Sequence, residues 1–330
     1  MTRSILLCLL AVAVAGCDHT TVPDGPNLVD RFGPFTLVEP LGADRQSVDF
    51  AAGEAVTFSA RFNKQTDWVL EIVGQESGAV RRIEGFSNEL TAENARWTGR
   101  TTELPLFRDE PVEARLFFPS EAGSDTSRAA VEVVSAREYP GRVLVDFEEG
   151  EDAAVTLGNF EFDFDLSRTG IQTDDPPAAQ GDRYYRLFGT DRTLDNFFVG
   201  LVQFSPPGNR GFVPVPTTVP EDLFFNAFVF GRGDAGTIAI LEVAVDANGN
   251  GRFNDGDTLF GSGEIRFDEE GWTLFSRSAA DLGLSDAQTS QIVAVRAVLI
   301  SDNNVQPTPR RPVEFGVDYI TFTGGGPLEL

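Results

Sequence analysis

Cysteine, lysine, histidine and methionine are scarce in this chain. Among 330 residues there are two cysteines, one histidine and one methionine, and Lys64 is the only lysine. The histidine, His19, lies two residues after Cys17 in a polar segment, which excludes a catalytic triad or a histidine-rich metal site further along the chain. The sequence also has no G-x-S-x-G motif and no glycine-rich loop that follows a strand and opens a helix. These absences favour a protein that is not an enzyme.

Basic residues are few beside the acidic ones. The 26 lysines and arginines stand against 51 aspartates and glutamates, so the formal net charge is −25 at pH 7. Such a field repels phosphate backbones and anionic lipid headgroups, which argues against nucleic acid as a partner and suits cation binding. A hydrolase on a β scaffold is the least favoured alternative. It stays open because a glycosidase needs only two carboxylates at the right separation in space.

The first seventeen residues form a short apolar segment that ends in a cysteine. Arg3 precedes an apolar run over residues 5–15, and the small residues Ala15 and Gly16 stand directly before Cys17. This pattern resembles a bacterial lipoprotein signal. The run is shorter than the ~20 residues that a transmembrane helix needs. The alternative is an ordinary cleaved signal that happens to contain a cysteine.

The lipoprotein resemblance implies a location. Residues 1–16 would be removed as a signal peptide, Cys17 would carry lipid, and the polar residues 17–32 would form a tether. We therefore expect an exported protein that is anchored to a membrane, at the outer membrane, the cell surface or the periplasmic face. Because Cys8 is lost with the signal, no disulfide can form within the mature chain, so its stability must come from its core or from bound metal.

Apolar residues recur with period two between residues 33 and 140. In the segment AVTFSARF, for example, Val56, Phe58 and Phe62 fall on one face and polar residues on the other. About seven such segments predict a β-sandwich over residues 33–140. The spacing and the isolated Trp68 resemble immunoglobulin-like and fibronectin-like domains, without the cysteine pair of a true immunoglobulin domain.

A second series of strand-like segments follows the break at Tyr139-Pro140-Gly141. About eight long segments over residues 141–330 predict a larger sandwich of the jelly-roll type. Residues 279–288 are a modest helix candidate, with Ser285 or Asp286 able to cap it. The predicted fold class is therefore all-β, with two sandwich domains after the signal and the tether.

Four short segments occur in a characteristic order within residues 142–324. The opening strand reads VDFE, a glycine–tyrosine strand reads GDRYYRLFG, a tryptophan leads the strand GWTL, and an aspartate lies within the closing strand VDYI. In this order of features the segment resembles the galactose-binding-like jelly roll of many carbohydrate-binding modules. The resemblance implies a glycan or another extracellular molecule as the ligand. It also implies a structural metal between an acid of the first strand and one of the last, where Glu148 and Asp318 stand. The alternative is that these are two ordinary surface acids.

The most specific motif is DANGNGRFNDGD, over residues 246–257. It matches the calcium-loop pattern D-x-[DN]-x-[DN]-G, in which short oxygen-bearing side chains alternate around a glycine turn. Its last position is an aspartate instead of the usual glutamate, and strand-like segments flank it, so we expect a structural calcium loop that joins two strands. The expected ligands are five side chains and one backbone carbonyl: Asp246, Asn248, Asn250, Asn254 and Asp257, with Arg252 supplying the carbonyl. The alternative is a solvated polar hairpin without metal.

Exposed aromatic side chains, on which sugar rings stack, are hard to find in this sequence. The weak candidates are Tyr184, Phe197, Phe198 and Trp272, all in or beside strands, where an aromatic residue more often belongs to the core. The tripeptide Arg232-Gly233-Asp234 is interpreted as a turn at the end of a strand, with no function assigned.

These features predict a membrane-anchored, exported and non-enzymatic lipoprotein. Its calcium-stabilised jelly-roll domain would bind a glycan or another extracellular ligand. The alternative is a structural or assembly protein of the cell envelope whose partner is another protein.

Overall fold

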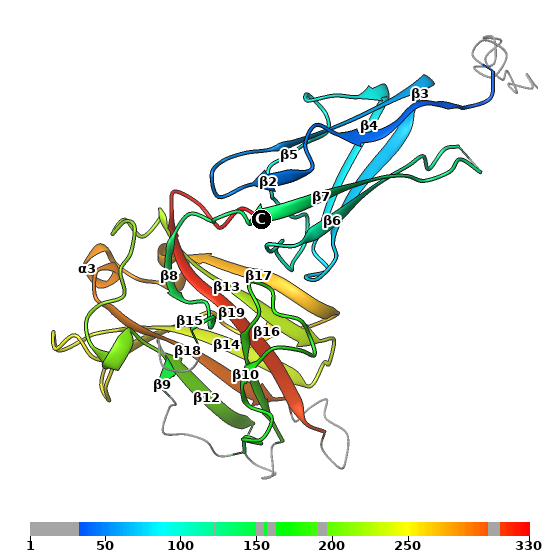
Figure 1. The fold of residues 1–330 in the computed structure, drawn as a ribbon. Helices are drawn as coiled ribbons and strands as arrows, with labels where there is room; N and C mark the ends of the chain where they lie inside the picture. Colours follow the sequence, from blue (N-terminus) through cyan, green and yellow to red (C-terminus); the bar gives the residue numbers. More distant parts are fainter. Residues whose placement is uncertain (1–32, 122, 150–154, 157–162, 191–196, 303–310) are drawn as a thin grey trace, which may run out of the picture.

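The computed structural model describes residues 33–121, 123–149, 155–156, 163–190, 197–302 and 311–330. Cys17 and the predicted tether lie outside the described residues. Figure 1 shows two bodies built of strands, an N-terminal body formed by β1 to β7 and a C-terminal body formed by the later strands. The prediction of an all-β chain is confirmed. Within the described part, no helix is long and apolar enough to cross a membrane.

The N-terminal body is a seven-stranded network around one hydrophobic core. Its strands are β1 (Leu37–Ala43), β2 (Ser47–Asp49), β3 (Val56–Gly74), β4 (Val80–Leu90), β5 (Arg96–Trp97), β6 (Pro111–Phe117) and β7 (Ser127–Ser135). They pair in the order β1-β3-β6-β7-β2, and β4 and β5 attach to β3. The described pairs are antiparallel except for β2 with β7, which is parallel.

The long strand β3 organises this core. Its residues alternate between buried and less buried positions, as the period-two pattern of the sequence predicts. The ring of Trp68 is fully buried, and its Nε1 donates to Ser87 Oγ on β4 at 2.8 Å. Gly85 is paired with Trp68, and a side chain at Gly85 would overlap the tryptophan ring. The tryptophan that stands alone in the sequence is therefore a core residue whose neighbour must be small.

The C-terminal body contains two six-stranded sheets. The first, which we call the β19 sheet, contains β8 (Arg142–Val145), β10 (Gly170–Gln172), β11 (Tyr184–Gly189), β13 (Leu223–Arg232), β17 (Glu270–Ser278) and β19 (Val313–Gly324). The second, the β18 sheet, contains β9 (Val155–Thr156), β12 (Phe198–Phe204), β14 (Thr237–Val245), β15 (Thr258–Gly261), β16 (Ile265–Arg266) and β18 (Ile292–Ser301). The described pairs in both sheets are antiparallel.

The two sheets share one hydrophobic core. Leu187 and Phe315 of the β19 sheet and Leu241 of the β18 sheet are fully buried in it. Neighbouring residues of a strand point to opposite faces, so Arg186 and Glu314 lie on the outer face of the β19 sheet, away from this core. Two antiparallel sheets that share a core form a sandwich, as the sequence predicts for this part of the chain.

The predicted helix over residues 279–288 is wrong in its extent. Two short helices occupy this stretch, α2 (Ala279–Leu282) and α3 (Asp286–Thr289). Gly283 has a φ of +91° and ends the first helix in the left-handed conformation. Ser285 begins the second with a capping box, in which its N–H donates to Gln288 Oε1 at 2.9 Å, so the predicted cap is confirmed.

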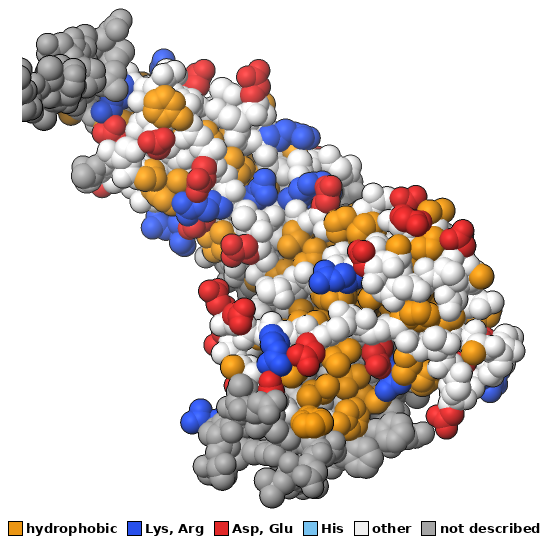
Figure 2. Space-filling model, turned by 180° about the vertical axis from the view of Figure 1, so that it is seen from behind, with side chains coloured by type: hydrophobic (Ala, Val, Ile, Leu, Met, Phe, Trp, Pro, Cys, Tyr) orange, Lys and Arg blue, Asp and Glu red, His pale blue; other side chains and the backbone are white. Residues whose placement is uncertain are grey.

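The two bodies contact each other. Leu106 of the N-terminal body donates its N–H to the carbonyl oxygen of Ala179 at 2.7 Å, and its side chain packs in a buried cluster with Phe228 of β13. The N-terminal body therefore covers the part of the outer face around Phe228. On the side of the molecule shown in Figure 2, acidic and basic side chains are scattered over the N-terminal body, whereas hydrophobic side chains gather on the C-terminal body.

Candidate functional site

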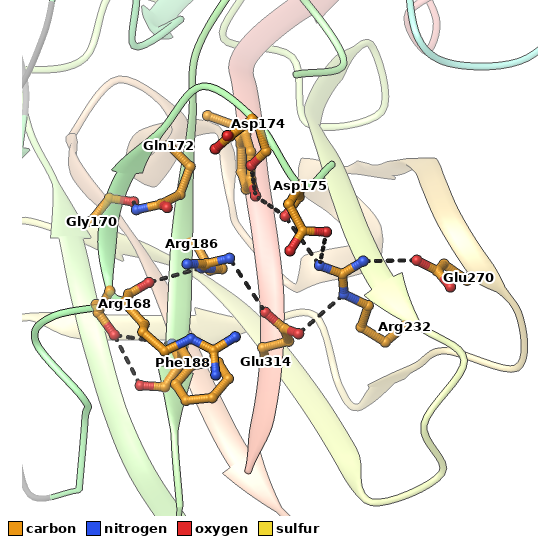
Figure 3. Close-up of polar contacts among 12 residues, drawn as sticks. Arg168, Gly170, Gln172, Asp174, Asp175, Arg186, Phe188, Arg232, Glu270 and Glu314 are labelled. Carbon is orange, nitrogen blue, oxygen red and sulfur yellow. Dashed lines mark hydrogen bonds and ion pairs between the residues drawn. The ribbon is translucent and has the colours of Figure 1, made fainter. Parts of the chain in front are cut away.

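Charged side chains meet on the outer face of the β19 sheet. Arg186 of β11, Glu314 of β19 and Arg232 of β13 come from three neighbouring strands and point toward one another, with Asp175 and Glu270 at the margin (Figure 3). We call these five residues the outer-face cluster. The antiparallel register of β11, β19 and β13 brings them together from distant parts of the sequence.

Arg232 is held rigidly within the cluster. Its guanidinium donates to Glu314 at 3.1 Å, to Glu270 at 2.8 Å and to the carboxylate of Asp175 at 2.8 Å. The hydrogen bond from Arg232 lowers the pKa of Asp175. Three acids around one arginine satisfy its donors and hold it in one geometry.

Arg186 and Glu314 form an incomplete pair. Only 8% of Arg186 is exposed, yet its Nη1 lies 3.9 Å from Glu314 Oε2, beyond hydrogen-bonding distance. Within the described residues, the Arg186 side chain makes one hydrogen bond, from Nε to the carbonyl oxygen of Arg168 at 2.8 Å. Glu314 Oε2 is buried and has no hydrogen-bond partner there. Each unsatisfied buried group costs about 1–3 kcal/mol unless water or a ligand completes it.

Apolar surface adjoins this pair. The guanidinium carbon of Arg168 lies 3.5 Å from the centre of the Phe188 ring and covers that ring. Leu166, two residues before Arg168, is exposed. The outer face thus places hydrogen-bonding groups near the stacked guanidinium of Arg168 and the exposed side chain of Leu166.

Two of the four aromatic residues predicted to bind ligand donate hydrogen bonds to the loop that contains Asp175 and Pro177. Tyr184 is fully buried, and its hydroxyl donates to the carbonyl oxygen of Asp175 at 2.9 Å. Trp272 is half-buried against Tyr184, with 5.3 Å between ring centres, and donates to the carbonyl oxygen of Pro177 at 2.9 Å. Tyr184 therefore offers no ring to a sugar, and Trp272 is engaged in holding the same loop.

The other two aromatic candidates lie on the β18 sheet. Phe197 is 58% exposed and directly precedes β12, and Phe198, the first residue of β12, is half-buried. The hydrophobic core separates this sheet from the outer-face cluster. The four aromatic residues therefore do not form one site.

Sequence reasoning missed Arg186, Arg232 and Glu314. Each is a charged residue within an otherwise apolar strand segment, in YYRLFG, FVFGR and VEFGV. A single charged residue in a strand more often faces solvent, and only the register places these three together. The sequence assigns Arg232 to a turn, and it does end β13 before Gly233, whose φ is +68°.

The 246–257 loop joins strands β14 and β15. Asp246 is buried, and its carboxylate accepts the N–H groups of Asn248 at 2.9 Å, Gly249 at 2.8 Å and Gly251 at 2.6 Å. Burial acts to raise the pKa of Asp246, but these N–H groups outweigh it, so the pKa is lowered. The first residue of the motif is therefore held as a carboxylate by the backbone of its own loop.

Other residues of this loop also bind its backbone. Asp257 accepts the N–H of Ala247 at 3.0 Å, and Asn250 accepts the N–H of Arg252 at 2.8 Å. Asn248 accepts the N–H of Asn250 at 3.1 Å. The loop therefore has a defined shape through its own hydrogen bonds, while a carboxylate or amide oxygen with one such bond still has a lone pair for a cation.

The donor set of this loop fits a hard cation. Its two carboxylates, three amide oxygens and one backbone carbonyl approach the six to eight oxygens that calcium takes. In the described part of the chain, no group of three or more His, Cys, Asp or Glu side chains is gathered as for a metal ion. A cation in this loop would depend on amide and carbonyl oxygens for most of its ligands.

Glu148 and Asp318 lie close enough to influence each other electrostatically. Asp318 is fully buried in β19, and its carboxylate accepts the N–H of Gln180 at 2.8 Å. Glu148 accepts the N–H groups of Asp182 and Arg183 at 2.9 and 3.0 Å. Both carboxylates therefore hold the same segment, and no described basic side chain forms an ion pair with either of them.

Burial without a counter-charge distinguishes this pair. Burial raises the pKa of Asp318 well above its ordinary value, and the charge of Glu148 adds to this effect. Burial also raises the pKa of Glu148. Gln180 Oε1 is buried and has no hydrogen-bond partner among the described residues. The two carboxylates supply hard oxygen donors of the kind that calcium takes.

Proteins similar to this chain were found among solved structures. No protein-family model and no curated protein matches its sequence. Among similar structures, one from a study of carbohydrate-binding modules of the β-sandwich superfamily is 15% identical, with 88% of this chain and 98% of that chain covered and a TM-score of 0.33. The protein SGBP-B from a xyloglucan utilization locus of Bacteroides uniformis is 13% identical, with 88% and 73% covered and a TM-score of 0.39.

A third similar structure is the module CBM27-1 of Caldicellulosiruptor saccharolyticus in complex with mannohexaose. It is 10% identical, with 58% of this chain and all of that chain covered and a TM-score of 0.37. Because all three identities are below 25% and all three TM-scores are below 0.5, these likenesses do not identify a ligand for this chain.

Proposed function

We propose that the protein is an exported, membrane-anchored lipoprotein that binds a glycan without modifying it, through the outer face of the β19 sheet. The observation that supports this is the incomplete pair of Arg186 and Glu314 beside the guanidinium of Arg168, which covers the Phe188 ring. A sugar hydroxyl both donates and accepts hydrogen bonds. Two neighbouring hydroxyls of one sugar can therefore complete the pair, one by donating to Glu314 Oε2 and the other by accepting from Arg186.

A neutral polysaccharide suits the charges of this face. The three acids around Arg232 compensate its charge, which leaves Arg186 as the cation whose terminal donors lack close partners in the described cluster. The net charge of −25 also disfavours anionic ligands such as phosphorylated glycans. The flat stack of Arg168 on Phe188 would support the apolar face of a sugar ring.

Calcium has a structural role in this proposal. One ion would lie in the 246–257 loop, held by the side-chain oxygens of Asp246, Asn248, Asn250, Asn254 and Asp257 and by the carbonyl oxygen of Arg252. A second would lie between Glu148 and Asp318. Each ion would neutralise buried carboxylates and fix a connection between strands, in a chain that has only two cysteines.

Binding of the full chain to arrayed neutral polysaccharides tests the glycan proposal. Arg186→Gln removes the charged donor and should weaken binding about 10- to 100-fold, because a hydrogen bond to a charged group contributes about 1.5–3 kcal/mol. Glu314→Gln should also weaken it. Arg277→Gln is the matched control, because Arg277 is exposed on β17 outside the cluster and should bind like the wild type.

Two outcomes would refute this assignment. If the wild-type chain binds no plant, algal or bacterial polysaccharide, the glycan is the wrong class of ligand. If it binds and Arg186→Gln binds equally well, the glycan lies elsewhere on the molecule.

The lipid anchor has its own test. Cells that express the chain and are fed labelled palmitate should incorporate the label into the wild-type protein, and Cys17→Ser should abolish incorporation and release the protein from the membrane fraction. Labelling that persists in Cys17→Ser would show that Cys17 is not the acceptor.

A protein partner in the cell envelope is the second candidate. It is favoured by Phe86, which is 63% exposed on β4, a strand that pairs along its length only with β3 among the described residues. An exposed strand edge with an apolar side chain can receive a strand of another protein. Phe86→Ser should abolish such an interaction and leave glycan binding unchanged.

A further inference from the structure

A cleft of about 690 Å³ lies where the two bodies meet. We call it the junction cleft. Its wall includes residues of the N-terminal body, of the connection to β8, and of the β19 sheet: Arg108, Arg137, Tyr139, Asp146, Gln180 and Tyr319. It is distinct from the outer-face cluster, because none of the five residues of that cluster lines it.

Direct contacts between the bodies fix the walls of this cleft. Arg108 on the N-terminal side forms a 2.7 Å ion pair with Asp182 on the other side. The neighbouring backbone bond from Leu106 to Ala179 is also 2.7 Å long, and the Leu106 side chain is buried with Tyr319. The cleft is therefore formed before any ligand arrives, and a ligand need not order it.

Unsatisfied polar atoms are concentrated around this cleft. The described residues include ten buried side-chain nitrogen or oxygen atoms without a hydrogen-bond partner, and four of them belong to residues that line the cleft. These four are Tyr139 Oη, Gln180 Oε1, Arg108 Nε and Arg137 Nε. Buried polar groups are normally paired, so the residues around this cleft keep hydrogen-bonding capacity that the described part of the chain does not use.

The chemistry of these groups matches a saccharide. Burial raises the pKa values of Tyr139 and Tyr319 to about 12, so both hydroxyls stay neutral near pH 7 and can donate as well as accept. Arg108 and Arg137 add donors, and Asp146 adds an acceptor. Acids oppose an anionic ligand here, and arginines oppose a cationic one. A neutral polyhydroxylated molecule is compatible with both.

We propose that the junction cleft is a second saccharide-binding site, separate from the outer-face cluster. This rests on the proposed function, since it takes the ligand to be the same class of neutral glycan. The N-terminal body is then part of the binding machinery, because Arg108 and Arg137 belong to it.

Calorimetric titration of the full chain tests for this second site. The titrant is a short oligosaccharide taken from the polysaccharide that the wild-type chain binds. The wild type should show two sites per chain. Arg186→Gln should lose the outer-face site and keep the cleft site. Tyr139→Phe and Tyr319→Phe should each weaken the cleft site about five- to tenfold, as expected for the loss of one hydrogen bond, and keep the outer-face site.

Thermal unfolding distinguishes a binding role of Tyr139 from a structural one. Because Tyr139 Oη has no hydrogen-bond partner among the described residues, Tyr139→Phe should leave the melting temperature of the unliganded chain unchanged or higher, and should reduce the further rise caused by saccharide. Tyr184→Phe is the matched control. Its hydroxyl is bonded to Asp175, so this change should lower the melting temperature of the unliganded chain and leave the cleft site intact.

The outcomes separate the two proposals. A single site that Arg186→Gln removes and the cleft variants leave unchanged would overturn the junction cleft and leave the proposed function standing. Two sites that survive in both tyrosine variants would also overturn it. A wild-type chain that binds no saccharide at all would overturn the proposed function and the cleft site with it.

Discussion

The 246–257 loop and the Glu148–Asp318 pair are both acidic, and they differ in how their charges are compensated. In the loop, backbone N–H groups surround Asp246 and lower its pKa. In the pair, burial dominates, and the pKa values of both carboxylates are raised. The loop is a specific motif whose negative charge is already stabilised by its own backbone. The pair is a weak motif whose charge is stabilised far less well.

A close match to a metal-binding sequence pattern therefore does not measure how much a bound cation would stabilise the site. A loop that satisfies itself gains a modest amount from calcium, because its hydrogen bonds already define its shape. The buried Asp318 and the half-buried Glu148 gain much more, because a divalent ion removes a desolvation penalty that their backbone hydrogen bonds offset only in part. We therefore expect the larger calcium effect at the less conspicuous site.

The largest expected effect is at Asp318. Calcium at 100 times its dissociation constant should raise the free energy of unfolding by about 2.7 kcal/mol, and Asp318→Asn should abolish most of this rise. In chelator the order should reverse, with Asp318→Asn at least as stable as the wild type, because it removes a buried charge. Urea unfolding in calcium and in chelator measures both. A calcium effect that persists undiminished in Asp318→Asn would place the ion elsewhere.

A smaller effect is expected in the loop. Asp257→Asn replaces a carboxylate that accepts the N–H of Ala247, and it should lower stability in calcium by about 1 kcal/mol, roughly the value of one hydrogen bond. Asp255→Asn is the matched control, because Asp255 is exposed in the same loop and is not an expected ligand. Equal losses in the two variants would mean that total charge, and not coordination, is responsible.

The next expected effect is the pH dependence of stability in chelator. In the folded chain Asp318 keeps its proton to a higher pH than in the unfolded chain, where its pKa is about 3.9. Stability should therefore fall as the pH rises above about 4, by at most about 1.4 kcal/mol per pH unit for one proton. Asp318→Asn should flatten this slope.

Asp246 should behave in the opposite way. Its lowered pKa adds stability above about pH 4, and that stability is lost as the pH falls through the folded-state value. Asp246→Asn should therefore reduce the loss of stability at low pH. Asp318→Asn should leave that loss unchanged. Urea midpoints between about pH 3 and 7 separate the two contributions, and parallel curves for the two variants would contradict the contrast between the sites.

Local features of the structure are predictable from the sequence. The alternation in AVTFSARF gives the buried face of β3, and the motif DANGNGRFNDGD lies between two strands as expected. Ser285 caps a helix turn, although Gly283 divides the predicted helix in two. These features depend on residues close together in the chain, so their physical causes can be read without knowing the fold.

The outer-face cluster and the junction cleft are not predictable in this way. Arg186, Arg232 and Glu314 are ordinary charged residues until the register of three strands brings them together. The aromatic candidates fail for the same reason, because the burial of Tyr184 depends on a loop that packs over it. Propensity and spacing say nothing about which distant segment covers a side chain.

The all-β class of this chain, its acidic composition and the acidic connection between β14 and β15 follow directly from the order of its amino acids. Periodicity, composition and local hydrogen-bonding patterns act over a few residues, so they are already contained in the order of amino acids. Which charged side chains are left without hydrogen-bond partners depends on the tertiary structure. Satisfaction of a buried polar group is a property of its three-dimensional surroundings, and those come from strands that are far apart in the chain.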